Sequence, residues 1–350
     1  MKPIDIILLN LLNEKAAIEG KTKPSRPGIG NFVSSTTVSQ MQAMNSFFPD
    51  AHYDAKKMFD LSKADYEILG YDMIMPVFSV VVESYAMGCA VDWGKPSMMP
   101  QIKSTIWKNY SDIGYRDKDI KNILLKNNAV KALLECLSML KKKYPHIAVC
   151  GKVFGPWTLS YHFFGVQEFL IKTIDNPLEV KSILDKLCLI TICFAELQAQ
   201  AGADIITVAD HATADLCSPQ SYRDFLIPVH SLLARQIKVP AVLHICGNTL
   251  DRLDYICRTG MAGFHFESKV DACAAQAVNK RRIALAGNIN NPSTLLFKKP
   301  RDVRKEALYA AKCGVKIIGP ECAVPLSTPA ENLLEISKTI KSLNNNTSAD

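Results

Sequence analysis

The sequence predicts a (β/α)8 TIM barrel with an extra N-terminal helix and a long second βα connection, and three observations favour this fold class. Strand-like and helix-like segments alternate along the 350 residues, eight apolar runs have the length of buried strands, and no G-x-G-x-x-G turn follows any of them. Alternation alone would also fit a doubly wound sheet, but eight strands without a dinucleotide-binding turn favour the barrel. No interdomain linker interrupts the pattern, so we expect one domain over residues 1–350.

Four of the expected strands follow a helix that ends at a glycine. These glycines are Gly70, Gly202, Gly260 and Gly314, and the strands lie within YDMIMPVF, ADIITVAD, MAGFHFES and VKIIGPEC. Glycine suits the left-handed backbone position just beyond a helix, so each copy indicates a helix end followed by a buried strand. Four further apolar runs of similar length lie near residues 30, 150, 244 and 286, within GIGNFVS, HIAVCGKV, PAVLHICG and RIALAGNI.

The segments between these strands show helical periodicity, for example NNAVKALLECLSMLKKK and PRDVRKEALYAAK. The connection from Phe78 to His146 is longer than a usual βα loop and contains VDWGKPSMMPQ. We expect it to form a lid or wall over the top face of the barrel. The NNNTSAD tail is expected to be peripheral.

Composition excludes several classes of protein. The formal charge is +7, but the 41 basic residues are scattered among 34 acidic ones, which does not indicate nucleic-acid binding. No apolar run approaches the roughly 20 residues of a membrane span, so we expect a cytoplasmic protein without a cleaved signal. The 11 cysteines follow no disulfide framework. We expect reduced thiols, most of which, such as Cys136, Cys188, Cys193 and Cys257, serve as small hydrophobic side chains.

A histidine and a cysteine lie side by side at one expected strand end. In PAVLHICGN, His244 and Cys246 are two residues apart, so both side chains project from the same face of the strand. Barrel enzymes place their chemistry at the C-terminal ends of strands. Imidazole nitrogen and thiolate sulfur are the ligands that zinc binds tetrahedrally, and the pair therefore predicts a metal site.

A third ligand should come from another strand end, and Cys322 qualifies best because it follows the strand in VKIIGP. Three protein ligands leave a fourth position for water or substrate in a catalytic zinc site. Glu267, which ends GFHFE, could occupy that position at rest. From the residues alone, a metal site and a coincidental His-x-Cys pair are equally favoured, because the sequence does not show that the two loops meet.

Three segments carry a resemblance to a known family. HICGN, AGNINNPSTLL and GPECAVPLSTPAENL resemble, in order and spacing, the corresponding segments of methylcobamide:coenzyme M methyltransferases, within the uroporphyrinogen decarboxylase superfamily. The likeness extends from about Gly28 to Ile340. It implies a catalytic Zn²⁺ at the positions of His244, Cys246 and Cys322.

The same resemblance implies the substrates. The methyl donor would be a methylcobamide carried by a partner corrinoid protein, since no cobalamin-binding domain is visible in this chain. The acceptor would be a small thiol, and coenzyme M is the leading candidate. A metal-bound thiol is deprotonated at neutral pH, and the thiolate is the required nucleophile. We expect Glu267 to be displaced as the substrate sulfur arrives.

One residue departs from the family pattern, and others are secondary candidates. Glu321 stands where a small residue is expected, and its carboxylate could repel a sulfonate-bearing thiol or could face away. Asp210, at the top of the fourth strand, is a candidate partner that orients the zinc histidine, and Asn288, at the top of the seventh, has a similar claim. His265, between two phenylalanines, is interpreted as a packed core histidine, while Tyr85 and Glu83 either line the mouth of the barrel or serve as wall residues.

Three rival functions remain open at the level of sequence. A corrinoid-linked demethylase would use the same metal to activate a methoxy or methylamine-type donor. A uroporphyrinogen decarboxylase would need arginines near the first strand, where IGNFVSSTTVS offers serines and threonines instead. A structural zinc would close all four positions with protein ligands.

Overall fold

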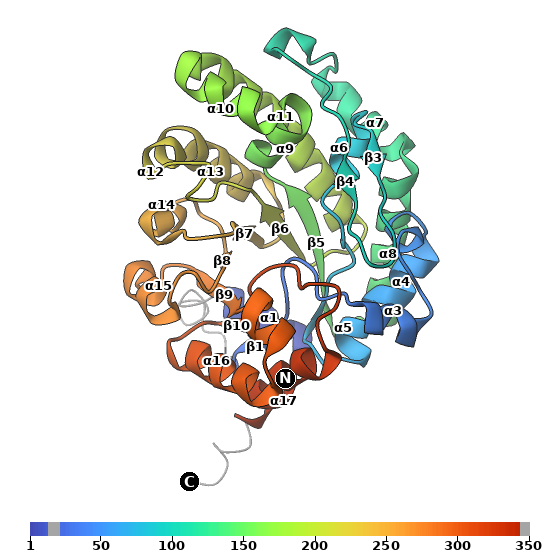
Figure 1. Ribbon diagram of the computed structural model, residues 1–350, viewed down its shortest axis with the longest axis vertical. Coiled ribbons are helices and arrows are strands. Elements are labelled where there is room, and N and C mark those ends of the chain that lie inside the picture. The colour runs from blue at the N-terminus through green and yellow to red at the C-terminus, as the bar shows by residue number, and fades with distance from the viewer. Residues whose placement is uncertain (13–21, 344–350) are drawn as a thin grey trace.

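The computed structural model describes residues 1–12 and 22–343, and its strands form one barrel-like sheet enclosed by helices (Figure 1). All neighbours in this sheet are parallel, in the order β1-β10-β9-β8-β7-β6-β5-β2, so the eight expected strands and the barrel are confirmed. The strands are β1 (Gly28–Ile29), β2 (Met73–Ile74), β5 (Ala148–Phe154), β6 (Ile205–Ala209), β7 (Ala241–His244), β8 (Gly263–Phe266), β9 (Ala284–Ile289) and β10 (Ile317–Pro320).

The outer layer contains the helices that the alternating pattern predicts (Figure 1). They are α3 (Val38–Met44), α4 (Ala55–Ser62), α5 (Ala64–Glu67), α7 (Ile120–Lys126), α8 (Asn128–Lys143), α9 (Pro156–Phe164), α10 (Val166–Asp175), α11 (Pro177–Gln200), α12 (Pro219–Ser221), α13 (Ile227–Gln236), α14 (Leu253–Ile256), α15 (Ala272–Asn279), α16 (Pro300–Lys312) and α17 (Ala330–Ser342). None of the helices within the described ranges combines the length and apolarity needed to cross a membrane.

The seam between β1 and β2 is closed by Asp72. Its backbone N–H donates to the Ile29 carbonyl at 2.9 Å, and its carboxylate accepts from the Ile29 N–H, also at 2.9 Å. The guanidinium of Arg26 holds the same carboxylate through two hydrogen bonds of 2.6 and 2.8 Å, and both side chains are buried. A bidentate pair of this kind fixes geometry as well as charge, so the first and last strands of the sheet are held together.

The extra N-terminal helix is confirmed as α1 (Pro3–Leu12), and it covers the N-terminal end of the barrel. Its buried side chains include Ile7 and Leu11. A Cβ atom on Gly28 would lie 2.7 Å from Ile7, and one on Gly263 would lie 3.2 Å from Leu11. Because these two glycines begin β1 and β8, α1 packs across the strand starts. The opposite end, where the strands finish, is left for a site.

The long connection between β2 and β5 is also confirmed, and it contains small elements besides α7 and α8. These are α6 (Val82–Ala86) and an antiparallel pair, β3 (Val91–Asp92) and β4 (Gln101–Ile102). The pair lies beside α6 and α7 at the edge of the molecule (Figure 1). Val80 and Glu83, at the start of this connection, approach the C-terminal end of β5, where the Phe154 N–H donates to a Glu83 carboxylate oxygen at 2.8 Å. The expected wall is therefore formed by the first part of the connection.

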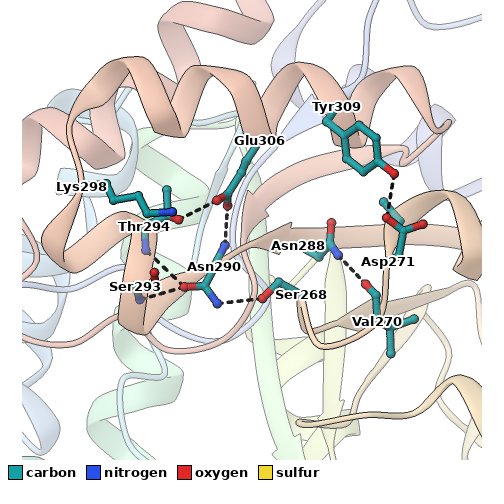
Figure 2. Close-up of a pocket in the computed structure, with 11 residues that line it drawn as sticks. Ser268, Val270, Asp271, Asn288, Asn290, Ser293, Thr294, Lys298, Glu306 and Tyr309 are labelled. Carbon is teal, nitrogen blue, oxygen red and sulfur yellow. Dashed lines mark hydrogen bonds between the residues drawn. The ribbon is translucent and has the colours of Figure 1, made fainter.

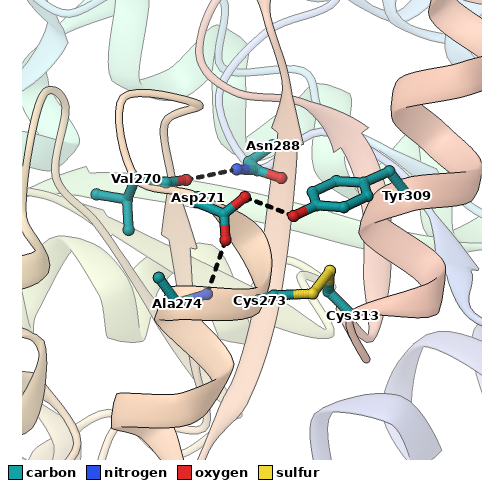
Figure 3. Close-up of a disulfide and its surroundings, with 7 residues drawn as sticks. All are labelled: Val270, Asp271, Cys273, Ala274, Asn288, Tyr309 and Cys313. Atoms are coloured by element: carbon teal, nitrogen blue, oxygen red, sulfur yellow. Dashed lines mark hydrogen bonds between the residues drawn. A yellow bond between two sulfur atoms is a disulfide. The ribbon is translucent and has the colours of Figure 1, made fainter.

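The cysteines include one disulfide, so the expectation of reduced thiols is wrong for one pair. Cys273 in α15 is bonded to Cys313 just after α16, and the nearby Tyr309 hydroxyl donates to Asp271 at 2.7 Å (Figure 3). The two residues are 40 positions apart, and only the packing of α15 against α16 brings them together. The expectation of buried thiols is confirmed for Cys136, Cys188 and Cys257, whereas Cys193 is half-buried. The NNNTSAD tail lies outside the described residues.

Candidate metal centre

Two loops at the C-terminal face bring the three expected ligands together. His244 is the last residue of β7, Cys246 follows it by two positions, and Cys322 lies two positions beyond the end of β10. The Cys246 sulfur lies 3.2 Å from His244 Nε2 and 3.6 Å from the Cys322 sulfur, and the Cys322 sulfur lies 3.5 Å from His244 Nε2. The open question of whether the loops meet is therefore answered: they do.

The donor set fits a tetrahedral zinc ion. Metal–sulfur lengths of about 2.3 Å and metal–nitrogen lengths of about 2.0–2.1 Å give a tetrahedral site edges of roughly 3.6–3.8 Å. The three measured separations, 3.2, 3.5 and 3.6 Å, are close to those edges. His244 is buried and the two cysteines are half-buried, so the site has access from one side. One imidazole and two thiols leave the fourth corner open.

His265 fixes the orientation of His244. The Nε2–H of His265 donates to the Pro320 carbonyl at 2.8 Å, and its Nδ1 lies 2.9 Å from Nδ1 of His244. Burial, followed by the nearness of His244, lowers the pKa of His265 well below its usual range, so its ring is neutral. Since its one proton is on Nε2, its Nδ1 accepts from His244 Nδ1–H, which also lies 3.2 Å from the backbone carbonyl of His265. The lone pair of His244 Nε2 then faces the two sulfurs.

A hydrogen bond joins the two sulfurs, which lie 3.6 Å apart. The hydrogen bond between them raises the pKa of the Cys246 thiol and lowers the pKa of Cys322. The charge of Glu267 adds to the effect on Cys246 and raises its pKa further. A metal that binds both sulfurs must therefore release the proton of this hydrogen bond, which makes metal affinity depend on pH.

Glu321 braces the loop that carries Cys322. Its buried carboxylate accepts from the backbone N–H of Ser268 at 2.6 Å and from that of Asn291 at 2.7 Å. The amide of Asn31 donates to the carbonyl of Cys322 at 3.0 Å and ties the same loop to β1. Of the two possibilities for Glu321, the structure shows the second: it faces away from the metal ligands.

A cavity of about 200 Å³ opens beside the three ligands at the C-terminal face. Its wall includes Lys152 of β5, Asp210 after β6, and Val80 of the long connection. Lys152 was not a candidate from the sequence, although a lysine inside the otherwise apolar run HIAVCGKV was the available signal. Burial lowers the pKa of Lys152 to about 8.

Asp210 does not orient His244, so that part of its expected role is wrong. Its carboxylate accepts from the N–H and hydroxyl of Thr158 at 2.7 and 3.0 Å through one oxygen and from His230 at 3.0 Å through the other. Only its backbone N–H reaches His244, at the carbonyl oxygen, 2.9 Å away. The partner of the metal histidine is His265, whose interpretation as a satisfied core histidine is correct but incomplete.

Glu267 lies beside Cys246, where the two side chains interact, and its place as the resting fourth ligand stays a prediction, whereas Asn288 lies apart from the three converging residues. Glu267 is near Cys246, yet among the described residues the ligand atoms within 4.8 Å of one another belong to His244, Cys246 and Cys322 only. Asn288 lines a separate cavity of about 350 Å³ between the ends of β8 and β9 and helix α16, where its amide donates to the Val270 carbonyl at 3.0 Å (Figure 2). The structure therefore does not bring Asn288 to the metal centre.

Comparison with known proteins gives one family and several close relatives. Residues 16–343 match the family model described as uroporphyrinogen decarboxylase (URO-D). The chain is 30% identical to a methylated-thiol–coenzyme M methyltransferase of Methanosarcina mazei over 87% of this chain and 81% of the relative. It is 27% identical to a methylcobamide:CoM methyltransferase of Methanosarcina acetivorans over 89% of this chain and 91% of the relative.

A solved structure supports the fold at the level of coordinates. A methyltransferase from Methanosarcina mazei superposes with a TM-score of 0.88 at 26% sequence identity, and the match covers 94% of this chain and 97% of that one. A B12-independent methionine synthase from a Shewanella species has a TM-score of 0.55 at 12% identity, so it resembles this chain in fold alone.

Proposed function

The chain belongs to the uroporphyrinogen decarboxylase (URO-D) family, and from this premise we propose that it transfers a methyl group from a methylated corrinoid protein to a small thiol at a zinc ion held by His244, Cys246 and Cys322. Its relatives are named as methyltransferases over most of its length, and the chain is a methyltransferase. The metal, the thiol and the corrinoid protein are the proposed parts. Coenzyme M is the leading acceptor because it is in the names of these relatives.

The single observation that supports zinc is the convergence of one imidazole nitrogen and two sulfurs within 3.6 Å at the open end of the barrel. Zinc, when bound there, would take the substrate thiol as its fourth ligand and lower the pKa of that thiol, so that the sulfur is a thiolate at neutral pH. Cys246 and Cys322 supply soft donors, and His265 keeps His244 in the tautomer that can ligate.

The reaction balances without a further co-reactant. The thiol loses its proton to solvent, its sulfur forms a bond to the methyl carbon, and the cobalt–carbon bond breaks with both electrons remaining on cobalt. Cobalt is thereby reduced from Co(III) to Co(I), and the product is a methyl thioether. The cavity lies at the C-terminal face, so the corrinoid protein is expected to dock over that face with its cobalt toward Cys246 and Cys322.

The reaction is tested by incubating the zinc-loaded protein with methylcobalamin and a panel of thiols while thioether formation is followed. Stoichiometric zinc and thioether are expected for the wild-type protein, whereas Cys322→Ala should lose both. Cys136→Ala is the matched control because Cys136 is a buried thiol in α8, away from the cavity. An unchanged rate in Cys322→Ala would refute the proposal.

The direction of transfer distinguishes the alternative. One relative is named for a methylated thiol as well as for coenzyme M, so a site of this kind can also face a methylated donor. Two assays separate the alternatives: methyl donors are tested with reduced cobalamin, and thiols with methylcobalamin. If methyl donors react and no thiol does, the chain is a corrinoid-linked demethylase. A protein without stoichiometric zinc would instead favour a uroporphyrinogen decarboxylase.

A further inference from the structure

Lys152 is a buried cation without a partner in the same cavity as the metal ligands. It lies on β5, its side chain is buried, and its ammonium nitrogen has no hydrogen-bond partner in the described part of the chain. The neighbouring Gly151 faces outward, because a Cβ atom there would meet Gln198 of α11. Residues alternate between the two faces of a strand, so Lys152 points into the barrel.

An unpaired ammonium in this position is energetically unfavourable. Removing a charge from water costs several kcal/mol unless an opposite charge and hydrogen bonds replace the lost hydration. Buried lysines are therefore rare without a partner. A ligand with an anionic group would supply the charge-assisted hydrogen bond that the Lys152 ammonium lacks among the described residues.

The neighbours of Lys152 leave its ammonium free to bind a ligand. Glu83 is close enough for the two charges to interact, and its second oxygen has no hydrogen-bond partner, but no hydrogen bond joins it to Lys152 and it does not line the cavity, whereas Lys152 does. The acidic side chain that does line the cavity, Asp210, has both oxygens occupied by Thr158 and His230. Lys152 is the one lysine or arginine among the described residues that line this cavity.

We propose that Lys152 binds an anionic group at the far end of the thiol substrate, a sulfonate or a carboxylate, and so makes the enzyme select charged thiols over neutral ones. The inference rests on the proposed function, because it places the sulfur of the same molecule at His244, Cys246 and Cys322. A cavity of about 200 Å³ suits a short thiol of this kind.

A probe without sulfur tests the anion site independently of the metal. Ethanesulfonate and propionate are titrated calorimetrically into the wild-type protein and into Lys152→Met, each with and without zinc. Loss of one charge-assisted hydrogen bond should weaken binding by about tenfold to a hundredfold. Lys131→Met removes the same charge from the exposed face of α8 and should bind as the wild type does.

Specificity for the thiol gives the second readout. The ratio of kcat/KM for 2-mercaptoethanesulfonate to that for 2-mercaptoethanol should fall by about tenfold to a hundredfold in Lys152→Met. A purely structural role would lower both kcat/KM values together and leave their ratio unchanged, and this result would overturn the proposal. Failure of the wild-type protein to bind either anion would overturn it as well. If no thiol is methylated at all but the anions still bind through Lys152, the proposed function fails and the anion site stands.

Discussion

His265 shows how one buried residue can decide the chemistry of another. Both of its ring nitrogens are engaged, one by the Pro320 carbonyl and one by His244. Because the first contact must be a donation, the second must be an acceptance, and the free lone pair of His244 is directed at the sulfurs. His265 is therefore a positioning residue that acts through His244.

Replacing His265 by phenylalanine should weaken zinc binding while the barrel still folds. Loss of such a supporting partner typically costs tenfold to a hundredfold in metal affinity, and we expect about tenfold for His265→Phe because the backbone carbonyl of residue 265 still accepts from His244. The measurement is a competition titration with a zinc chelator. His230→Phe is the matched control, since His230 is equally buried but bonds Asp210 and Tyr222 instead. Equal zinc affinities in the two variants would argue against the positioning role.

Side-chain direction explains which site residues the sequence could predict. His244, Cys246 and Cys322 were predictable because zinc chemistry and strand ends point to the same residues. Asp210 and Asn288 also lie near strand ends, but their side chains bond Thr158 and Val270 instead. The sequence pattern does not predict the direction of these side chains. Lys152 and His265 were missed as functional residues because each lies inside a strand, where only the folded barrel shows what it faces.

The short helix α5 contains a buried acid at the junction with β2. Asp65 is fully enclosed, and its carboxylate accepts from the Met75 N–H at 3.1 Å just beyond the end of β2. Burial raises the pKa of Asp65 to about 7. The carboxyl group therefore keeps its proton in the folded protein at pH values where the unfolded chain has already lost it.

This acid should make the protein less stable as the pH rises. Between about pH 4 and pH 7 the folded state holds more protons than the unfolded state, so the free energy of unfolding falls with pH, by at most about 1.4 kcal/mol per pH unit from this group. Asp65→Asn should remove that part of the slope. Urea denaturation of both proteins at pH 5 and pH 7 measures it, and identical slopes would show that Asp65 is not the cause.

At the scale of elements the sequence predicted the barrel well. Gly70, Gly202, Gly260 and Gly314 all adopt φ values between +66° and +117°, the left-handed region expected beyond a helix end. The β3–β4 pair was not predicted because Val91–Asp92 and Gln101–Ile102 stand in no apolar run of strand length. The disulfide was not predicted because Cys273 and Cys313 follow no regular spacing and meet only through helix packing.

The whole molecule assigns different tasks to the two ends of the barrel. Helix α1 packs across the strand starts, whereas the three ligands lie at the strand ends and Lys152, inside β5, lines the cavity beside them. The proposed corrinoid protein would therefore approach the sulfurs from the C-terminal face. The long connection between β2 and β5 forms part of the rim of that face through Val80.

The open fourth corner at His244, Cys246 and Cys322 is the central claim, and zinc K-edge X-ray absorption spectroscopy tests it most directly. The zinc-loaded protein should show two sulfur neighbours with nitrogen or oxygen neighbours, and addition of the thiol should raise the number of sulfurs from two to three. The Cys322→Ala protein should not bind zinc stoichiometrically. A spectrum that is unchanged by any thiol would contradict the account and identify the zinc as a closed structural site.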